Sequence, residues 1–95
     1  MRFTWDDEKN RGNRRKHGIS FETATRVFLD PFHITRQDRI VEGEERWQSI
    51  GRVDDVLLVL VAYSVADDED EVLCIISARR VTRQERIEYE EASEI

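Results

Sequence analysis

The sequence predicts an α+β fold: an antiparallel meander sheet of about four to five strands, flanked by two N-terminal helices and one C-terminal helix. Residues 56–63 form an unbroken apolar run, and residues 72–76 form a second one. Both runs are far shorter than the roughly 20 residues that span a bilayer, and their β-branched content favours buried strands. The consecutive acidic residues 67–71 between them cannot be buried, so they predict an exposed turn of a central hairpin.

We expect a short edge strand over residues 3–5 and a helix over residues 7–17. Asp6 is a typical N-cap residue, and Gly18 suits the left-handed conformation that ends many helices. The predicted helix contains no apolar residue, which is typical of a helix that is solvated or held by partners. Its residues from position 9 onward carry a local charge of +5, which fits a solvated face and a phosphate- or partner-binding face equally well.

A second helix is predicted over residues 21–29, with Ser20 as its N-cap. Its apolar residues recur at helical spacing and form one stripe, which we interpret as part of the core. Pro31 ends this helix, because the residue before a proline is pushed out of the helical region.

Two strands, over residues 32–41 and 45–53, are predicted to precede the central hairpin. Trp47 and Ile50 do not share a face under strict alternation, so either a bulge or burial on both faces is expected. Short loops connect these strands, which is why the predicted sheet is a meander.

The second apolar run leads directly into two arginines and the start of a final helix. Thr82 and Glu85 form a capping box that opens a helix ending at about residue 91. Arg79 and Arg80 therefore lie where a strand ends and a helix begins, a position at which anions bind. From the residues alone, a surface salt bridge between Arg79 and Glu85 is the simpler interpretation.

Composition narrows the class of protein. The 95 residues suffice for one small domain, and we expect residues 1–95 to form a single domain. The net charge of −6 argues against indiscriminate nucleic-acid binding. His17 and His33 have no companions at ligand spacing, and no nucleotide-binding or nucleophile-elbow motif occurs, so neither a metal nor a cofactor is expected. Cys74 is the single cysteine, and no signal peptide or membrane-spanning run is present, which indicates a cytoplasmic protein.

Cations and hydroxyl groups remain as candidates for chemistry. RNA can be cleaved without a metal when a base activates the ribose 2′-OH, an acid protonates the leaving 5′-oxygen and arginines stabilise the phosphorane. The candidate proton-transfer residues are Glu85, Tyr89, His17 and Glu45.

Two segments, Lys16-His17-Gly18-Ile19-Ser20-Phe21 and Ile76-Ser77-Ala78-Arg79, are specific in combination at this spacing. Further matching residues span almost the whole chain: Phe3, Trp5-Asp6, Lys9, Asn13, Ala24, Val27-Phe28, Asp30-Pro31, Glu45-Arg46-Trp47, Ile50-Gly51, Glu85 and Tyr89. Taken together, the sequence resembles the BrnT-type toxins of bacterial type II toxin–antitoxin modules.

This resemblance implies a RelE-like fold and a metal-independent ribonuclease toxin that inhibits translation by cleaving RNA. It also implies a BrnA-type antitoxin, a small ribbon-helix-helix DNA-binding protein that neutralises the toxin. The pair would repress its own promoter, with DNA bound only through the antitoxin.

Carried over residue by residue, the resemblance implies that Arg79 and Glu85 lie at the catalytic site with Tyr89 nearby. It implies that Lys16 and His17 line an adjacent basic face that contacts RNA. Two further cations are expected to bind RNA: Arg80 and Arg46.

Two positions depart from the family pattern. This chain has Ser64-Val65-Ala66 just past the central strand and Cys74 before Ile75-Ile76, where family members commonly have basic residues. A second hypothesis is therefore a catalytically weakened subunit that binds the antitoxin and contributes to autorepression without cleaving RNA. A third is a free-standing interaction module.

Overall fold

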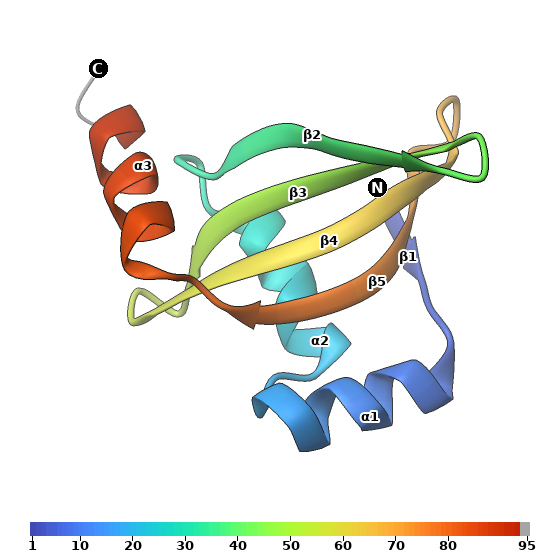
Figure 1. Cartoon of the computed structure of the whole chain (residues 1–95), viewed down its shortest axis with the longest axis horizontal. Coiled ribbons are helices and arrows are strands. Elements are labelled where there is room, and N and C mark those ends of the chain that lie inside the picture. The colour runs from blue at the N-terminus through green and yellow to red at the C-terminus, as the bar shows by residue number, and fades with distance from the viewer. Residues whose placement is uncertain (94–95) are drawn as a thin grey trace.

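The computed structural model describes residues 1–93 and shows one sheet with helices on both of its faces (Figure 1). The sheet has the strand order β1-β5-β4-β3-β2, with the apolar strand β4 in the middle. The elements in chain order are β1 (Arg2–Thr4), α1 (Asp7–His17), α2 (Phe21–Ala24), the 3₁₀ helix η1 (Thr25–Leu29), β2 (Ile34–Val41), β3 (Glu44–Val53), β4 (Leu57–Asp67), β5 (Val72–Arg80) and α3 (Arg83–Ser93).

The predicted α+β class and the meander of β2 to β5 are confirmed, because these four strands pair antiparallel in sequence order. Strand β1 lies at the edge of the sheet, as predicted, and pairs parallel with β5, outside the meander. A hairpin would force antiparallel pairing, but β1 is joined to the other strands through α1, α2 and η1, and this long connection permits either direction.

The two faces of the sheet pack against different helices. The larger core lies between the sheet and the N-terminal helices, and it includes Phe21, Val27, Val59 and Val61. A smaller core lies under α3 and consists of Ile50, Leu58, Leu60 and Tyr89. Strand β3 contributes to both cores, because Trp47 packs against the first and Ile50 belongs to the second, so the expectation of two-sided burial is confirmed.

Opposite Ala62 and Tyr63 of β4, strand β5 contains one extra residue. Ala62 pairs with Ser77 and Tyr63 pairs with Ile75, so Ile76 lies in a bulge. After this bulge, Ala78 faces the larger core, while Arg79 pairs with Leu60 of β4 on the α3 side.

Helix α1 has the predicted bounds and caps. The Asp6 carboxylate accepts hydrogen bonds from the backbone N–H groups of Glu8 at 2.8 Å and Lys9 at 3.1 Å. Gly18 takes a φ of 72°, the left-handed conformation expected at the C-terminal end.

The second predicted helix is correct in position and only partly in type. Residues 21–24 are α-helical, but Thr25–Leu29 tightens into a 3₁₀ helix. Close packing accompanies this tightening: a Cβ atom at Gly51 of β3 would lie only 2.8 Å from the Val27 carbonyl oxygen.

A single buried amide attaches the polar helix α1 to the sheet. Asn13, whose exposed fraction is 8%, donates from Nδ2 to the carbonyl oxygens of Ala78 at 2.8 Å and Ile19 at 2.9 Å. Its Oδ1 accepts from the Ala78 N–H at 3.1 Å. The Asn13 amide therefore attaches α1 to the backbone of β5. Its oxygen and its nitrogen both have hydrogen-bond partners, as buried polar groups require.

Candidate functional site

Four charged side chains meet on the sheet face that α3 covers. Arg79 comes from the end of β5, Arg36 from β2, and Glu85 and Glu88 from successive turns of α3. We call this group the arginine–glutamate cluster. The capping box at the start of α3 fixes its position, because Glu85 Oε1 accepts from the Thr82 N–H at 2.8 Å and the Thr82 hydroxyl accepts from the Glu85 N–H at 3.2 Å.

Glu85 is the centre of the cluster. Both of its oxygens accept from Arg79, at 2.8 and 3.0 Å, in the bidentate geometry that guanidinium and carboxylate groups favour. Arg36 Nη2 donates to Glu85 Oε2 at 3.3 Å. Hydrogen bonds from Arg79 lower the pKa of Glu85 to about 2, outweighing the opposing effect of burial. Glu85 is only 8% exposed and stays ionised at neutral pH.

Arg36 was not among the candidates from sequence. It lies in a strand of mixed charge and belongs to no recognisable motif. It reaches the cluster because the register of β2 on β3 places it opposite Gln48. Its Nε donates to Gln48 Oε1 at 2.9 Å, and its Nη1 donates to Glu88 Oε2 at 2.6 Å. Two guanidinium groups thus converge on the carboxylates of α3.

Beside the cluster, the sheet face has a floor of small and polar side chains. Gln48, Ala62 and Ser77 lie next to one another across β3, β4 and β5, two residues along from Ile50, Leu60 and Arg79 in their strands. All three floor residues are only partly buried. The arrangement provides partly exposed guanidinium groups over an open floor, which is suited to binding an anion such as a phosphodiester.

The structure brings together two of the three residues that we predicted to be catalytic. Arg79 and Glu85 are in direct contact, whereas the Tyr89 hydroxyl donates to Asp30 Oδ2 at 2.6 Å. Burial and the bond to Asp30 raise the pKa of Tyr89. Tyr89 therefore lies at a separate pocket on the same helix, one turn beyond Glu85.

The residues predicted to bind RNA are dispersed. Lys16 and His17 are in the last turn of α1, which lies along the edge of the sheet beside β5, where Asn13 bonds to the backbone of Ala78 (Figure 1). Arg80 is exposed and neighbours Arg79 in the strand, where side chains alternate between faces.

Arg46 is the predicted RNA-binding residue that shares a sheet face with the floor. It lies two residues from Gln48 in β3, and its Nε donates to Glu44 Oε1 at 3.2 Å. Cys74 pairs with Ser64, the first residue of the Ser64-Val65-Ala66 segment, on this face. Neither side chain adds positive charge to the open face.

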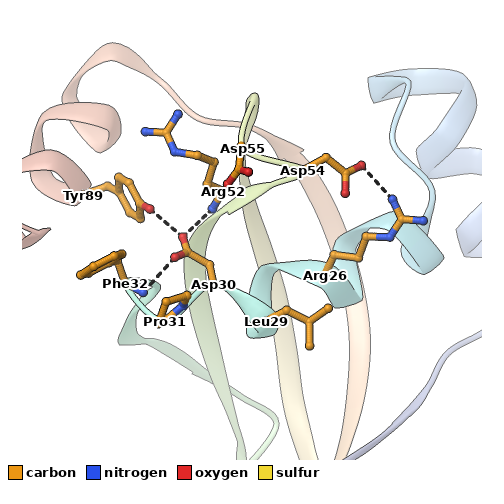
Figure 2. A pocket seen from close by; sticks show the side chains of 9 residues that line it. All are labelled: Arg26, Leu29, Asp30, Pro31, Phe32, Arg52, Asp54, Asp55 and Tyr89. Atoms are coloured by element: carbon orange, nitrogen blue, oxygen red, sulfur yellow. Dashed lines mark hydrogen bonds and ion pairs between the residues drawn. The ribbon is translucent and has the colours of Figure 1, made fainter.

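A hollow of about 460 Å³ lies at the end of the sheet near α3, and we call it the Asp30 pocket (Figure 2). Asp30 accepts three hydrogen bonds, from the Tyr89 hydroxyl and from the backbone N–H groups of Arg52 and Phe32, both at 2.8 Å. Burial raises the pKa of Asp30, but these bonds outweigh it and hold the pKa below its usual range. The Arg52 guanidinium lies 5.6 Å from the centre of the Tyr89 ring. The sequence did not predict this pocket; of its residues, only Asp30-Pro31 and Tyr89 belonged to the segments that match the family.

Within residues 1–93, no group of three or more His, Cys, Asp or Glu side chains is arranged to hold a metal ion. None of the helices in the same part of the chain is long and apolar enough to span a bilayer.

The fold is similar to that of a known class of small bacterial toxins. The crystal structure of the Brucella abortus ribonuclease toxin BrnT superposes with a TM-score of 0.65. The match covers 87% of this chain and 99% of that chain, at 24% sequence identity. No curated protein sequence matches the chain.

The family follows from the sequence match. The model of the family described as ribonuclease toxin, BrnT, of type II toxin–antitoxin system matches residues 5–85. The chain therefore belongs to the BrnT family of type II toxin–antitoxin systems, and membership implies an antitoxin partner.

Proposed function

We propose that this chain is a metal-independent endoribonuclease that inhibits translation and is neutralised by a BrnA-type antitoxin. One observation carries the proposal: Arg79 and Arg36 both donate to the Glu85 carboxylate beside an open floor. Two guanidinium groups that bind a carboxylate can also bind a phosphodiester, because both anions accept hydrogen bonds from the same planar donors.

In this mechanism Arg79 and Arg36 bind the scissile phosphate and stabilise the extra negative charge of the phosphorane. Preorganised donors of this kind are worth about 10²–10³ in rate each when they are removed singly. The Gln48 side chain keeps Arg36 in place through its hydrogen bond at 2.9 Å.

Glu85 is the residue that we propose as general base for the 2′-OH. In the free protein its pKa of about 2 makes it a weak base, because an effective base has a pKa near the working pH. An RNA phosphate that takes over the donors of Arg79 removes the largest of the interactions that lower this pKa, while the hydrogen bonds with Thr82 remain. The phosphate also adds a negative charge nearby, so substrate binding itself strengthens the base.

Tyr89 has a supporting role in this proposal. Its hydroxyl is bound to Asp30, and its ring belongs to the smaller core under α3, so it fixes the helix that carries Glu85. We assign it to positioning rather than to proton transfer.

The proposed antitoxin is a ribbon-helix-helix protein, and DNA is bound only through it. The net charge of −6 supports this division, because an acidic toxin is poorly suited to bind DNA alone. RNA is the proposed substrate, and the cytoplasm is the proposed compartment.

The test is a cleavage assay with the purified chain, free of antitoxin, on a labelled single-stranded RNA in the presence of EDTA. We expect cleavage with 2′,3′-cyclic phosphate ends, and a loss of about 100-fold or more in Arg79→Ala. Arg79→Lys should be intermediate, because lysine keeps the charge but not the bidentate geometry. Arg86→Ala is the matched control, since Arg86 pairs with Glu90 at 3.9 Å on the same helix and should cleave normally.

Circular dichroism must first show that each variant folds, because Arg79→Ala leaves a largely buried carboxylate with fewer donors. A folded wild-type chain that does not cleave RNA, or a folded Arg79→Ala variant that cleaves as fast as wild type, would refute the nuclease proposal.

A second function, the catalytically weakened subunit, is favoured by one specific observation. The two arginines of the cluster are matched by two glutamates, and Cys74 and Ser64 add no positive charge to the same face. In this case induced expression would leave growth unaffected, while the chain would still bind its antitoxin and increase repression of the promoter.

A further inference from the structure

The Asp30 pocket is not used by the proposed nuclease site, and its apolar rim faces solvent. Leu29 is 79% exposed and Phe32 is 59% exposed, and both line the pocket (Figure 2). Val56, in the turn that follows the pocket residues Asp54 and Asp55, is also exposed. Large apolar side chains gathered around one hollow mark an interaction site more often than a chance surface.

The charged residues of the pocket define what it can bind. Asp30 already accepts three hydrogen bonds, and Asp54 forms an ion pair with Arg26 at 2.9 Å. Arg52 and Asp55 form no ion pair within residues 1–93, and Figure 2 shows the Arg52 guanidinium directed away from Asp30. The pocket thus offers one cation on its α3 side, one carboxylate on its turn side and apolar surface at its mouth.

These charges disfavour RNA as the occupant. Three carboxylates and two guanidinium groups line the pocket, so a phosphate backbone would meet a net negative surface. A polypeptide segment can satisfy both unpaired charges and cover the apolar rim at the same time, because its side chains can carry either sign.

We propose that the Asp30 pocket docks a segment of the antitoxin, an inference that rests on the toxin–antitoxin function proposed above. The segment presents an apolar side chain that packs between Leu29 and Phe32, an acidic residue that pairs with Arg52 and a basic residue that pairs with Asp55. A volume of about 460 Å³ is sufficient for one or two side chains. Apolar anchors that fill a pocket supply most of the affinity of such interfaces.

The test is isothermal titration calorimetry of this chain with the product of the reading frame adjacent to its gene. We expect Leu29→Ser and Phe32→Ser each to weaken the Kd about tenfold or more, and Arg52→Gln to weaken it several-fold. The matched control is Ile40→Ser, because Ile40 of β2 is similarly apolar and 63% exposed but does not line the pocket. Its Kd should stay within about twofold of wild type. Thermal unfolding checks that the variants are folded, which is expected since Leu29, Phe32 and Ile40 are exposed and Arg52 is only partly buried.

The outcomes separate this inference from the proposed nuclease. If the wild type binds and the pocket variants bind equally well, or if Ile40→Ser weakens binding just as much, the docking site is wrong while the toxin function stands. If the wild type does not bind the antitoxin, both the proposed partner and the docking site fail. Antitoxin binding that depends on the pocket, in a chain that cleaves no RNA, supports the docking site and refutes only the nuclease.

Two other occupants would also overturn the proposal. One is a single-stranded RNA oligonucleotide whose affinity falls in Phe32→Ser while that of the antitoxin does not. The other is self-association, detected by light scattering, that Phe32→Ser abolishes without changing antitoxin binding.

Discussion

Helices α1 and α3 have the same length, 11 residues, and both contain few apolar residues, yet they are attached to the sheet differently. Helix α1 is held by the neutral amide of Asn13, which bonds to the backbone of β5. Helix α3 is held by the ionised carboxylate of Glu85 and by the bond between Tyr89 and Asp30, together with a small apolar core. The bonds of α1 to the sheet should therefore be insensitive to pH and salt, whereas those of α3 should depend on both.

The difference teaches why the two attachments to the sheet differ in function. The bonds that hold α1 to the sheet are made by the neutral Asn13 amide with the β5 backbone, and an external anion cannot replace them. The bonds that hold α3 use guanidinium groups that also bind phosphate, so a ligand at the arginine–glutamate cluster competes with the attachment of the helix. An attachment that serves only the fold and one that a ligand can compete with are thus distinguished by the choice of neutral or charged contacts.

The largest expected effect is that of Asn13→Leu. Removing the amide leaves the buried N–H and C=O of Ala78 without partners, and each such group costs about 1–3 kcal/mol. We expect a loss of about 3 kcal/mol in the free energy of unfolding, measured by urea titration, with the same value at pH 4 and pH 8. A loss that changes with pH would contradict the proposed contrast between the helices.

Glu85→Gln should have the next largest effect, and it should depend on pH. The pKa of Glu85 is about 2 in the folded protein against an ordinary value of 4.5. Between these two values the carboxylate is protonated in the unfolded chain but still ionised in the folded chain. The stabilisation is complete above pH 4.5 and is lost as the pH falls toward 2, and its size is about 2–3 kcal/mol.

The measurement is the free energy of unfolding of wild type and Glu85→Gln as a function of pH. The variant should be less stable at pH 7 and should show a smaller decrease in acid. Glu90→Gln is the control, because Glu90 is exposed on the same helix. An acid decrease of equal size in wild type and Glu85→Gln would assign the effect to other carboxylates.

Tyr89→Phe should have a smaller effect, because it removes one hydrogen bond and keeps the ring in the core. We expect a loss of about 1.5 kcal/mol, with faster amide hydrogen exchange in α3 and unchanged exchange in α1. The pKa of Asp30, followed by NMR, should rise because one of its donors is lost. Equal loss of protection in both helices would mean that α3 is not attached independently.

The smallest effect is expected for Asp6→Ala, which removes the N-cap of α1. Such a substitution typically costs about 1 kcal/mol. Exchange should become faster in the first turn of α1 only, since Asn13 still holds the rest of the helix. A loss of protection along the whole helix would show that the cap contributes more than the amide does.

The bounds of most elements could be predicted because local chemistry determines them. Asp6 and Gly18 mark the ends of α1, and the Thr82–Glu85 capping box marks the start of α3. The apolar runs predicted β4 and β5, although β4 continues to Asp67 and the exposed turn therefore begins one residue later than expected.

The features that could not be predicted depend on residues far apart in the chain. Asn13 and Ala78 are 65 positions apart, and an asparagine within a basic helix has no pattern that reveals such a contact. Arg36 joins the cluster only through its register with Gln48. The direction of the Tyr89 side chain depends on Asp30, 59 positions earlier, so the sequence favoured a place beside Arg79.

The supernumerary residue Ile76 determines the phase of everything that follows it in β5. If Ile76 paired regularly with Ala62 instead of lying in a bulge, the alternation of the strand would turn the Arg79 guanidinium toward the larger core and would put the methyl group of Ala78 on the open surface. Losing the bulge while keeping the residue would thus abolish the anion site and detach α1 in a single step, without altering any residue that forms either. A relative that lacks Ile76 altogether can keep both features, because the residues after it would keep their partners in β4.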